Sequence, residues 1–290
     1  MIEFCGLPLR HRVINASGCY DVLAAARVFG GALHDAFPFS AYVSKTITLG
    51  ARDGNPPPRL WESAAGLINS IGLPNRGLRA YLEYDLPALA ELPVPLITNV
   101  MGSTPEEVGE LVAALEHEPA VAAIELNVSC PNVATGLDIG ADPQGLEALL
   151  SQVRPLSSKP LIVKLTPNTA DVAACAQGAQ AGGADAVSLI NTLRAFALAP
   201  GGGGAWLGGG SGGLSGPAIR AVALAQVSAV ARRVEIPIIG MGGISSGADA
   251  RDLIAAGATL VAVGTESFRD PAAGSRIAAE LDSGFTQIAR

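Results

Sequence analysis

Short apolar runs recur along the chain, and stretches with the helical spacing of apolar residues separate most of them. Each run is mostly apolar rather than alternating, which is typical of parallel strands that are buried on both faces. We expect eight strands, at residues 12–16, 41–47, 95–100, 122–128, 161–166, 186–191, 237–240 and 260–264.

Helix-start signals lie between these strands. Thr104 can cap a helix, Pro105 suits its first position, and Glu107 completes a capping box. Asp142-Pro143 and residues 215–217 predict two further helix starts.

Repeated strand–helix units in a chain of 290 residues predict an α/β fold, a TIM (β/α)8 barrel with long active-site loops. An open doubly wound sheet is the alternative. No linker, low-complexity tail or charge run marks a second domain, and eight strands without a break fit closure better. We therefore expect one barrel domain over residues 1–290.

Two connections are long, at residues 48–79 and 193–216, and the second is crowded with glycine. Long loops after barrel strands lie on the catalytic face and often act as lids. The glycine run is not a dinucleotide fingerprint, because it lacks both the strand–turn–helix context and the acidic residue that follows in such motifs.

The predicted strands end in amides, hydroxyls, glycines and two lysines. In a barrel these ends share one face of the molecule. A role in capping a turn explains a polar residue at any one strand end. It does not readily explain why all eight strand ends carry such residues. Amides offer donors and acceptors together, which suits a polar heterocycle. The residues are Ser17, Lys45, Thr46, Asn99, Asn127, Cys130, Lys164, Asn191, Thr192, Gly242, Gly243, Gly264 and Thr265.

The last two strand ends, at residues 239–245 and 261–265, are typical of a phosphate site built from glycine N–H groups. Tight turns alone are the alternative. Lys45 and Lys164 each need an anionic partner if they are buried. A phosphate, a substrate carboxylate or an electron-rich ring could each be that partner.

Cys130 follows the fourth predicted strand and is flanked by Asn127 and Asn132, while Pro131 stops the ladder. A thiol held there can act as a base or nucleophile on a bound ring, although a free cysteine also packs as a small hydrophobe. None of the three histidines lies at a predicted strand end, which argues against a histidine base. We expect the other cysteines, Cys5, Cys19 and Cys175, to be packing residues.

Composition narrows the function classes. A net charge of −7 with only 16% charged residues argues against nucleic-acid binding. The four cysteines form no C-x-x-C pair, so we expect neither a metal site nor a disulfide framework. Without a signal peptide or an apolar run of membrane length, the expected compartment is the cytoplasm.

With these motifs the chain resembles the class 1 dihydroorotate dehydrogenases, and within that class the 1B branch. The matching segments run in order over nearly the whole sequence, at residues 16–19, 45–46, 54–56, 69–73, Asn99, 126–133, 163–168, 190–192, 212–219, 238–244 and 263–265. Residues 239–243 and the glycine-leucine-serine stretch at 213–215 favour 1B over 1A.

The resemblance implies an FMN-binding barrel that oxidises (S)-dihydroorotate to orotate in pyrimidine biosynthesis. Cys130 would take the C5 proton while hydride leaves C6 for flavin N5, and Lys164 would stabilise negative charge on the reduced ring. Substrate would contact Lys45, Asn69, Ser70, Ile71, Gly72, Leu73, Asn127, Asn132, Asn191 and Thr192. FMN would contact Ser17, Lys45, Thr46, Asn99, Asn127, Lys164, Ile190, Gly216, Gly242, Gly243, Gly264 and Thr265.

The 1B resemblance also implies a partner chain with FAD and an iron–sulfur cluster that passes electrons to NAD, and we expect a homodimer. The segment at 193–210 is richer in glycine than is usual in the family, which leaves its order and its partner contacts open.

Four alternatives remain. They are a dihydropyrimidine dehydrogenase-like barrel, a tRNA dihydrouridine synthase, a non-catalytic FMN- or phosphate-binding barrel and a fumarate-linked 1A enzyme. The acidic net charge argues against the tRNA enzyme, which needs a basic face.

Overall fold

The structure of the chain is a computed structural model that describes residues 1–128 and 139–288. Eight strands form one sheet in the order β3-β14-β13-β10-β9-β8-β7-β4, and all neighbouring pairs are parallel. Each overlaps one of the predicted runs, so the strand prediction is confirmed, although several strands are shorter. Their bounds are β3 (Val13–Asn15), β4 (Tyr42–Val43), β7 (Leu96–Val100), β8 (Val121–Asn127), β9 (Leu161–Lys164), β10 (Ala186–Leu189), β13 (Ile238–Met241) and β14 (Leu260–Val263).

A side chain completes the cylinder between β3 and β4, the two ends of the sheet. Asn15 Nδ2 donates to the Val43 carbonyl (2.8 Å), and the Val43 N–H donates to Asn15 Oδ1 (2.9 Å). The side-chain amide of Asn15 thus takes the place of a backbone peptide group in pairing with β4. In addition, the Ser40 N–H donates to the Val13 carbonyl (3.0 Å). The predicted barrel is confirmed, and the open sheet is not formed.

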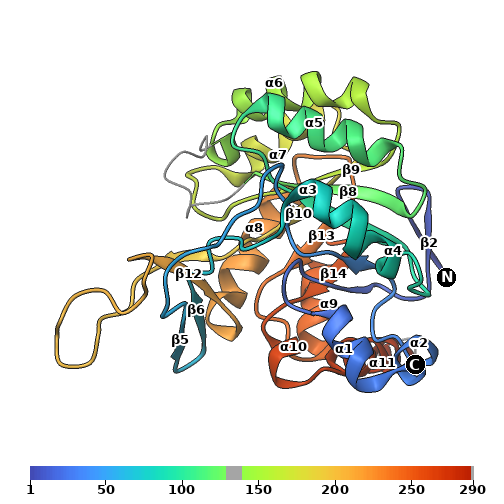
Figure 1. Cartoon of the computed structure of the whole chain (residues 1–290). Coiled ribbons are helices and arrows are strands. Elements are labelled where there is room, and N and C mark those ends of the chain that lie inside the picture. Colours follow the sequence, from blue (N-terminus) through green and yellow to red (C-terminus); the bar gives the residue numbers. More distant parts are fainter. Residues whose placement is uncertain (129–138, 289–290) are drawn as a thin grey trace.

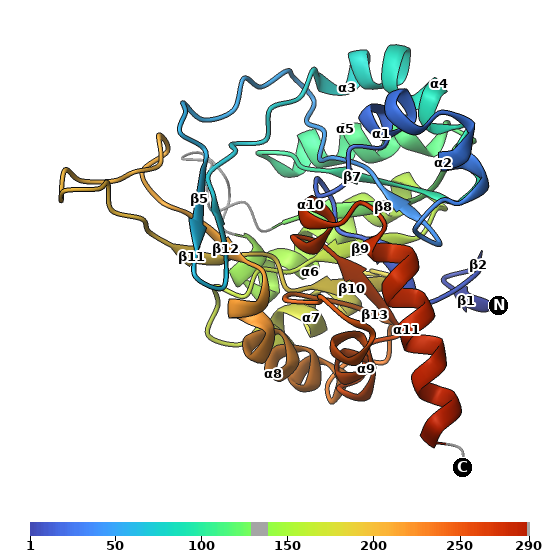
Figure 2. The same ribbon diagram turned by 90° about the horizontal axis from the view of Figure 1, so that it is seen from below.

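Helices lie outside the strands (Figures 1 and 2). The Thr104 hydroxyl accepts the N–H of Glu107 (3.3 Å) and Asp142 accepts that of Gln144 (3.1 Å), as the capping signals predict. Pro217 begins a short 3₁₀ turn that leads into α8. The helices are α1 (Val22–Phe29), α2 (Gly31–Asp35), α3 (Gly77–Ala80), α4 (Leu86–Leu89), α5 (Pro105–Glu116), α6 (Pro143–Val153), α7 (Val172–Ala181), α8 (Arg220–Ala231), α9 (Gly247–Ala255), α10 (Glu266–Arg269) and α11 (Ala273–Ile288).

Apolar side chains fill the barrel from its amino end. The hairpin of β1 (Ile2–Phe4) and β2 (Leu7–Leu9) packs Phe4 and Leu9 against the inward residues of the barrel strands, such as Ile97 and Ile162. With that end plugged, ligands can reach the barrel interior only from the carboxyl ends of the strands.

The two long connections are present as predicted, and they contain strands that the sequence analysis did not predict. They form an antiparallel sheet in the order β11-β12-β6-β5, from β5 (Leu60–Ser63), β6 (Gly66–Asn69), β11 (Leu193–Ala195) and β12 (Gly212–Ser215). The pairing of β6 with β12 joins segments that are far apart in the chain, and glycine-rich strands carry no alternating pattern.

Between β11 and β12, residues 196–211 extend away from the barrel, and we call this segment the arm (Figure 1). Trp206 anchors its base, since the indole N–H donates to the Leu60 carbonyl (3.2 Å) and the ring packs edge-on against Trp61.

We predict that Asn15→Leu destabilises the fold by about 2–5 kcal/mol, because it leaves a buried N–H and a buried carbonyl of Val43 unpaired. Chemical denaturation measures the change. Thr98→Val is the control, since it removes one buried hydroxyl bond, to Tyr81, and is expected to cost about 1 kcal/mol. Equal stabilities of the two variants would contradict the closing role of Asn15.

Candidate active site

The carboxyl ends of the barrel strands surround a polar mouth. Asn127, Lys164 and Ser188 lie in register on β8, β9 and β10. Lys164 is only 6% exposed, and Ser188 and Asn99 are fully buried. The predicted polar strand ends are therefore brought together on one face, as closure of the barrel requires.

Cys19 and two lysines meet on one side of the mouth. A Cβ placed on Gly18 would lie 3.6 Å from Lys45 Nζ, and one placed on Gly264 would lie 3.6 Å from Cys19 Sγ. Burial raises the pKa of the Cys19 thiol, although the positive charges of Lys164 and Lys45 offset part of that rise. Our packing assignment of Cys19 missed this location, although its place just after the first strand was a signal.

Lys45 is exposed at the open mouth, yet the surrounding protein removes much of its water. This desolvation lowers the pKa of Lys45; the Cys19 sulfur opposes the shift, and Lys164 adds to it. A bound anion would relieve both effects, so this pair of cations suits a phosphate, a carboxylate or a reduced ring.

The inside of the barrel, below the mouth, holds a buried polar network. Asn99 Nδ2 donates to Glu125 Oε1, and the Ser188 hydroxyl donates to Glu125 Oε2 (2.8 Å). Asn99 Oδ1 is buried and has no hydrogen-bond partner among the described residues. Glu125 was missed from the sequence, although an acidic residue inside an apolar run was a signal.

Glycines bring the loop after β13 close to the start of α8. Gly242 and Gly243 have φ of +125° and +75°, and a Cβ on Gly243 would lie 2.7 Å from Arg220 Cβ. Any larger residue would push the loop from the helix. The Thr265 hydroxyl donates to Ser215 Oγ (2.8 Å), which joins the last loop to the residue before Gly216. These are the residues in which the sequence predicts a phosphate site.

The predicted ring-binding amides lie on β6 of the antiparallel sheet (Asn69), at the end of β8 (Asn127) and just before β11 (Asn191). Asn69 Nδ2 donates to the Gly213 carbonyl (3.2 Å), which links β6 to β12. Asn191 Nδ2 donates to Asn127 Oδ1 (3.5 Å), and the Thr192 N–H donates to Asn191 Oδ1 (2.8 Å). Amides from three separate segments thus lie around one region.

Asn55 fixes the turn at residues 70–73 through hydrogen bonds. Its Nδ2 donates to Ser70 Oγ (3.0 Å), and its N–H donates to the Ile71 carbonyl (3.0 Å). Gly72 and Leu73 both have positive φ, and a Cβ on Gly72 would lie 2.4 Å from Asn55 N. The turn is therefore fixed against the segment that precedes β5.

The remaining predicted cofactor residues lie along the same rim. The Ser17 hydroxyl donates to the Ser44 carbonyl (2.8 Å) and Thr46 is buried. A Cβ on Gly242 would lie 3.2 Å from Ile190 Cγ1, so Ile190 borders the glycine loop.

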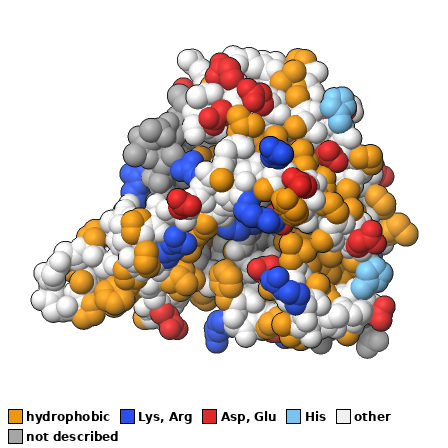
Figure 3. All heavy atoms as spheres, in the orientation of Figure 1, with side chains coloured by type: hydrophobic (Ala, Val, Ile, Leu, Met, Phe, Trp, Pro, Cys, Tyr) orange, Lys and Arg blue, Asp and Glu red, His pale blue; other side chains and the backbone are white. Residues whose placement is uncertain are grey.

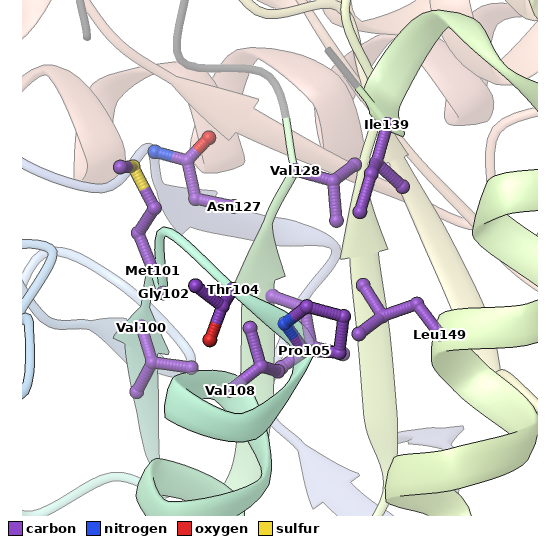
Figure 4. Close-up of a pocket in the computed structure, with 11 residues that line it drawn as sticks. Val100, Met101, Gly102, Thr104, Pro105, Val108, Asn127, Val128, Ile139 and Leu149 are labelled. Carbon is purple, nitrogen blue, oxygen red and sulfur yellow. The ribbon is translucent and has the colours of Figure 1, made fainter. Parts of the chain in front are cut away.

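A separate pocket beside Asn127 lies between β7, β8, the first turn of α5 and Leu149 in the middle of α6 (Figure 4). Its walls are mostly aliphatic, from Val100, Val108, Val128, Ile139 and Leu149, so it does not suit a charged heterocycle. Two of its lining residues, Val128 and Ile139, flank residues 129–138 in the sequence. The predicted Cys130 and Asn132 lie outside the described residues.

In the described ranges, no helix is long and apolar enough to cross a membrane. The same residues contain no group of three or more His, Cys, Asp or Glu side chains that could hold a metal ion.

We predict that Gly213→Ala lowers the expected oxidation of dihydroorotate by about 10- to 100-fold, since an added Cβ would lie 1.9 Å from Thr192 Oγ1 and small misplacements are costly. The rate with a dye acceptor measures this. Gly203→Ala is the control, because its Cβ would meet nothing within 4 Å. Equal rates in the two variants would remove the contact between β12 and Thr192 from the site.

Comparisons with known proteins agree with this geometry. The profile of the family described as Dihydroorotate dehydrogenase matches residues 1–285. Proteins named "Dihydroorotate dehydrogenase B (NAD(+)), catalytic subunit" are similar over nearly the whole chain. The one from Pelobacter propionicus is 44% identical over 97% of this chain and 91% of its own length. Those from Geobacter sp. (97% of this chain, 91% of the relative) and Desulforudis audaxviator (99% and 92%) are 43% and 42% identical. A family match of this extent, over a barrel whose mouth carries the expected polar residues, leads to one conclusion: the chain belongs to the dihydroorotate dehydrogenase family.

Proposed function

We propose that the protein oxidises (S)-dihydroorotate to orotate in pyrimidine biosynthesis, as the catalytic subunit of an NAD-linked enzyme, with residues 1–290 as one domain in the cytoplasm. The family match over residues 1–285 carries this proposal. The polar mouth supports it, because dihydroorotate has a carboxylate and a ring of alternating N–H and carbonyl groups.

We propose FMN as the cofactor, held by Ser17, Lys45, Thr46, Asn99, Asn127, Lys164, Ile190, Gly216, Gly242, Gly243, Gly264 and Thr265. Two observations fit it. The glycine loop after β13 lies against the start of α8, which suits a phosphate. Asn99 Oδ1 has no partner among the described residues and suits an N–H donor of the cofactor, since buried acceptors are almost always satisfied. When bound, FMN supplies the acceptor for the hydride that leaves C6.

Different residues around the mouth would bind different groups of the substrate. Lys45 provides positive charge for the substrate carboxylate, and the amides of Asn69, Asn127 and Asn191 can match the ring N–H and carbonyl groups. Ser70, Ile71, Gly72, Leu73, Asn132 and Thr192 complete the proposed substrate set. Cys130 is the proposed base for the C5 proton, assigned from the sequence alone.

Lys164 contributes positive charge from inside the barrel. Its ammonium is nearly buried, and it is the one basic residue within the eight barrel strands, all of which the structure describes. A buried cation favours nearby negative charge. Lys164 therefore stabilises the negative charge that the flavin ring gains when it is reduced by the substrate.

A homodimer completes the proposal. Phe196 and Leu198 on the arm are 56% and 62% exposed, and hydrophobic side chains are visible along the arm in the space-filling view (Figure 3). Exposed apolar surface of this kind favours association with another chain. The second candidate substrate is a pyrimidine of the kind used by dihydropyrimidine dehydrogenase. The two candidates differ in whether the substrate ring needs a carboxylate to pair with Lys45.

We predict that purified protein releases FMN on denaturation, and that Cys130→Ala keeps FMN but slows flavin reduction by more than about 100-fold. The thiolate is the active form and a free thiol titrates near ~8.5, so wild-type reduction should quicken as the pH rises toward that value. Rapid-mixing absorbance measures it.

Cys175→Ala is the matched control, because Cys175 is buried in α7 outside the barrel strands. It should reduce its flavin at the wild-type rate. Wild-type reduction by Cys130→Ala would remove Cys130 from the chemistry, and release of FAD would refute the cofactor.

We predict that the isolated chain reduces a dye with dihydroorotate but barely reduces NAD, because its four cysteines lack cluster spacing and it has no dinucleotide fingerprint. Adding the proposed FAD and iron–sulfur subunit should restore NAD reduction. Rapid NAD reduction by the chain alone would contradict this division of labour. Efficient use of fumarate would favour the 1A branch.

A further inference from the structure

Glu125 is the one acidic residue within the eight barrel strands, all of which lie in the described part of the chain. It is 2% exposed and lies in the middle of β8. A carboxylate in such a place is costly unless its oxygens are hydrogen-bonded. The ion pairs between described residues do not include Glu125, so its partners are neutral groups.

Those partners fix the orientation of one amide. Glu125 Oε1 accepts from Asn99 Nδ2, and Oε2 accepts from the Ser188 hydroxyl (2.8 Å). Both carboxyl oxygens of Glu125 therefore act as acceptors, so the NH₂ group of Asn99 is the part of its amide that faces them. With the amide reversed, two acceptor oxygens would meet in a buried place.

The backbone of Asn99 is also held. Its N–H donates to Ser44 Oγ (3.1 Å), and its carbonyl accepts the N–H of Ile47 (3.0 Å). With backbone and NH₂ group both bonded, Asn99 Oδ1 is left as a fixed, buried acceptor without a partner among the described residues.

We propose that Glu125 is a positioning residue: it holds the Asn99 amide so that Oδ1 faces the cofactor as an acceptor for a ring N–H of the flavin. The inference rests on the proposed FMN site. The oxidised flavin ring carries a single N–H, on its imide, between two carbonyl groups. An acceptor-only contact therefore selects that N–H, whereas a free amide could turn its NH₂ group to a carbonyl instead.

A double-mutant cycle on FMN affinity tests this role. Glu125→Gln keeps the size of the side chain but lets its amide, and hence that of Asn99, turn over. Its dissociation constant for FMN, measured by fluorescence quenching on apoprotein, should rise about tenfold, the loss of one buried hydrogen bond. Asn99→Ala should show a similar rise. The double variant should be no weaker than the weaker single variant, because Glu125 acts only through Asn99.

Two further variants separate position from charge and from general damage. Glu125→Asp keeps the charge but draws the carboxylate back by one methylene, so it should weaken FMN binding as Glu125→Gln does. Thr98→Val removes a buried bond on the outer side of the same strand, to Tyr81, and should leave the affinity and the visible bands of bound FMN unchanged. Those bands should shift alike in Glu125→Gln and Asn99→Ala. Thermal midpoints of the apoproteins report whether each variant is folded.

The outcomes are distinct. If wild-type protein binds no FMN, the proposed function and this inference both fail. If wild-type protein binds FMN, then wild-type affinity in Glu125→Gln or Glu125→Asp overturns the inference alone. So does a double variant about a hundredfold weaker than wild type, because additive losses mean that Glu125 acts independently of Asn99.

Discussion

Closure of the parallel barrel at the gap between β3 and β4 is the constraint on which the rest of the structure depends. The gap is bridged by the Asn15 side chain rather than by a full ladder, and Ser17 continues the bridge with its bond to the Ser44 carbonyl. Ser17 and Lys45 follow directly on these two strands, so the bridge sets their separation. Because all eight strands are parallel, the same closure also brings Asn99, Asn127 and Lys164 to one mouth.

Polar groups can be buried together at modest cost in free energy when most of them have hydrogen-bond partners. Within the barrel, Glu125 satisfies Asn99 and Ser188, and at the rim Asn191 pairs with both Asn127 and the Thr192 backbone. At the mouth, Asn99 Oδ1 has no hydrogen-bond partner among the described residues, and desolvation lowers the pKa of Lys45. A ligand with an N–H donor and a negative charge would give a hydrogen bond to Asn99 Oδ1 and a counter-charge to Lys45.

Much of this arrangement follows from sequence. The eight strands are recognisable because parallel strands are apolar on both faces, and α5 and α6 because Thr104 and Asp142 are strong caps. The sheet of β5, β6, β11 and β12 is not recognisable, since its pairing depends on the absence of a side chain at Gly212, next to Asn69 of β6, and on contacts far along the chain. Glu125 and Cys19 were missed for another reason: their roles depend on which side chains they face, and spacing does not report that.

A crystal structure of the purified protein with orotate tests the central claim most directly. The account predicts FMN with its phosphate against the Gly242–Gly243 and Gly264–Thr265 loops, and its ring above Asn99 and Lys164. Orotate should lie between that ring and the amides of Asn69, Asn127 and Asn191. A flavin whose phosphate lies elsewhere, or a mouth that stays free of flavin while orotate binds in the aliphatic pocket beside Asn127, would contradict it.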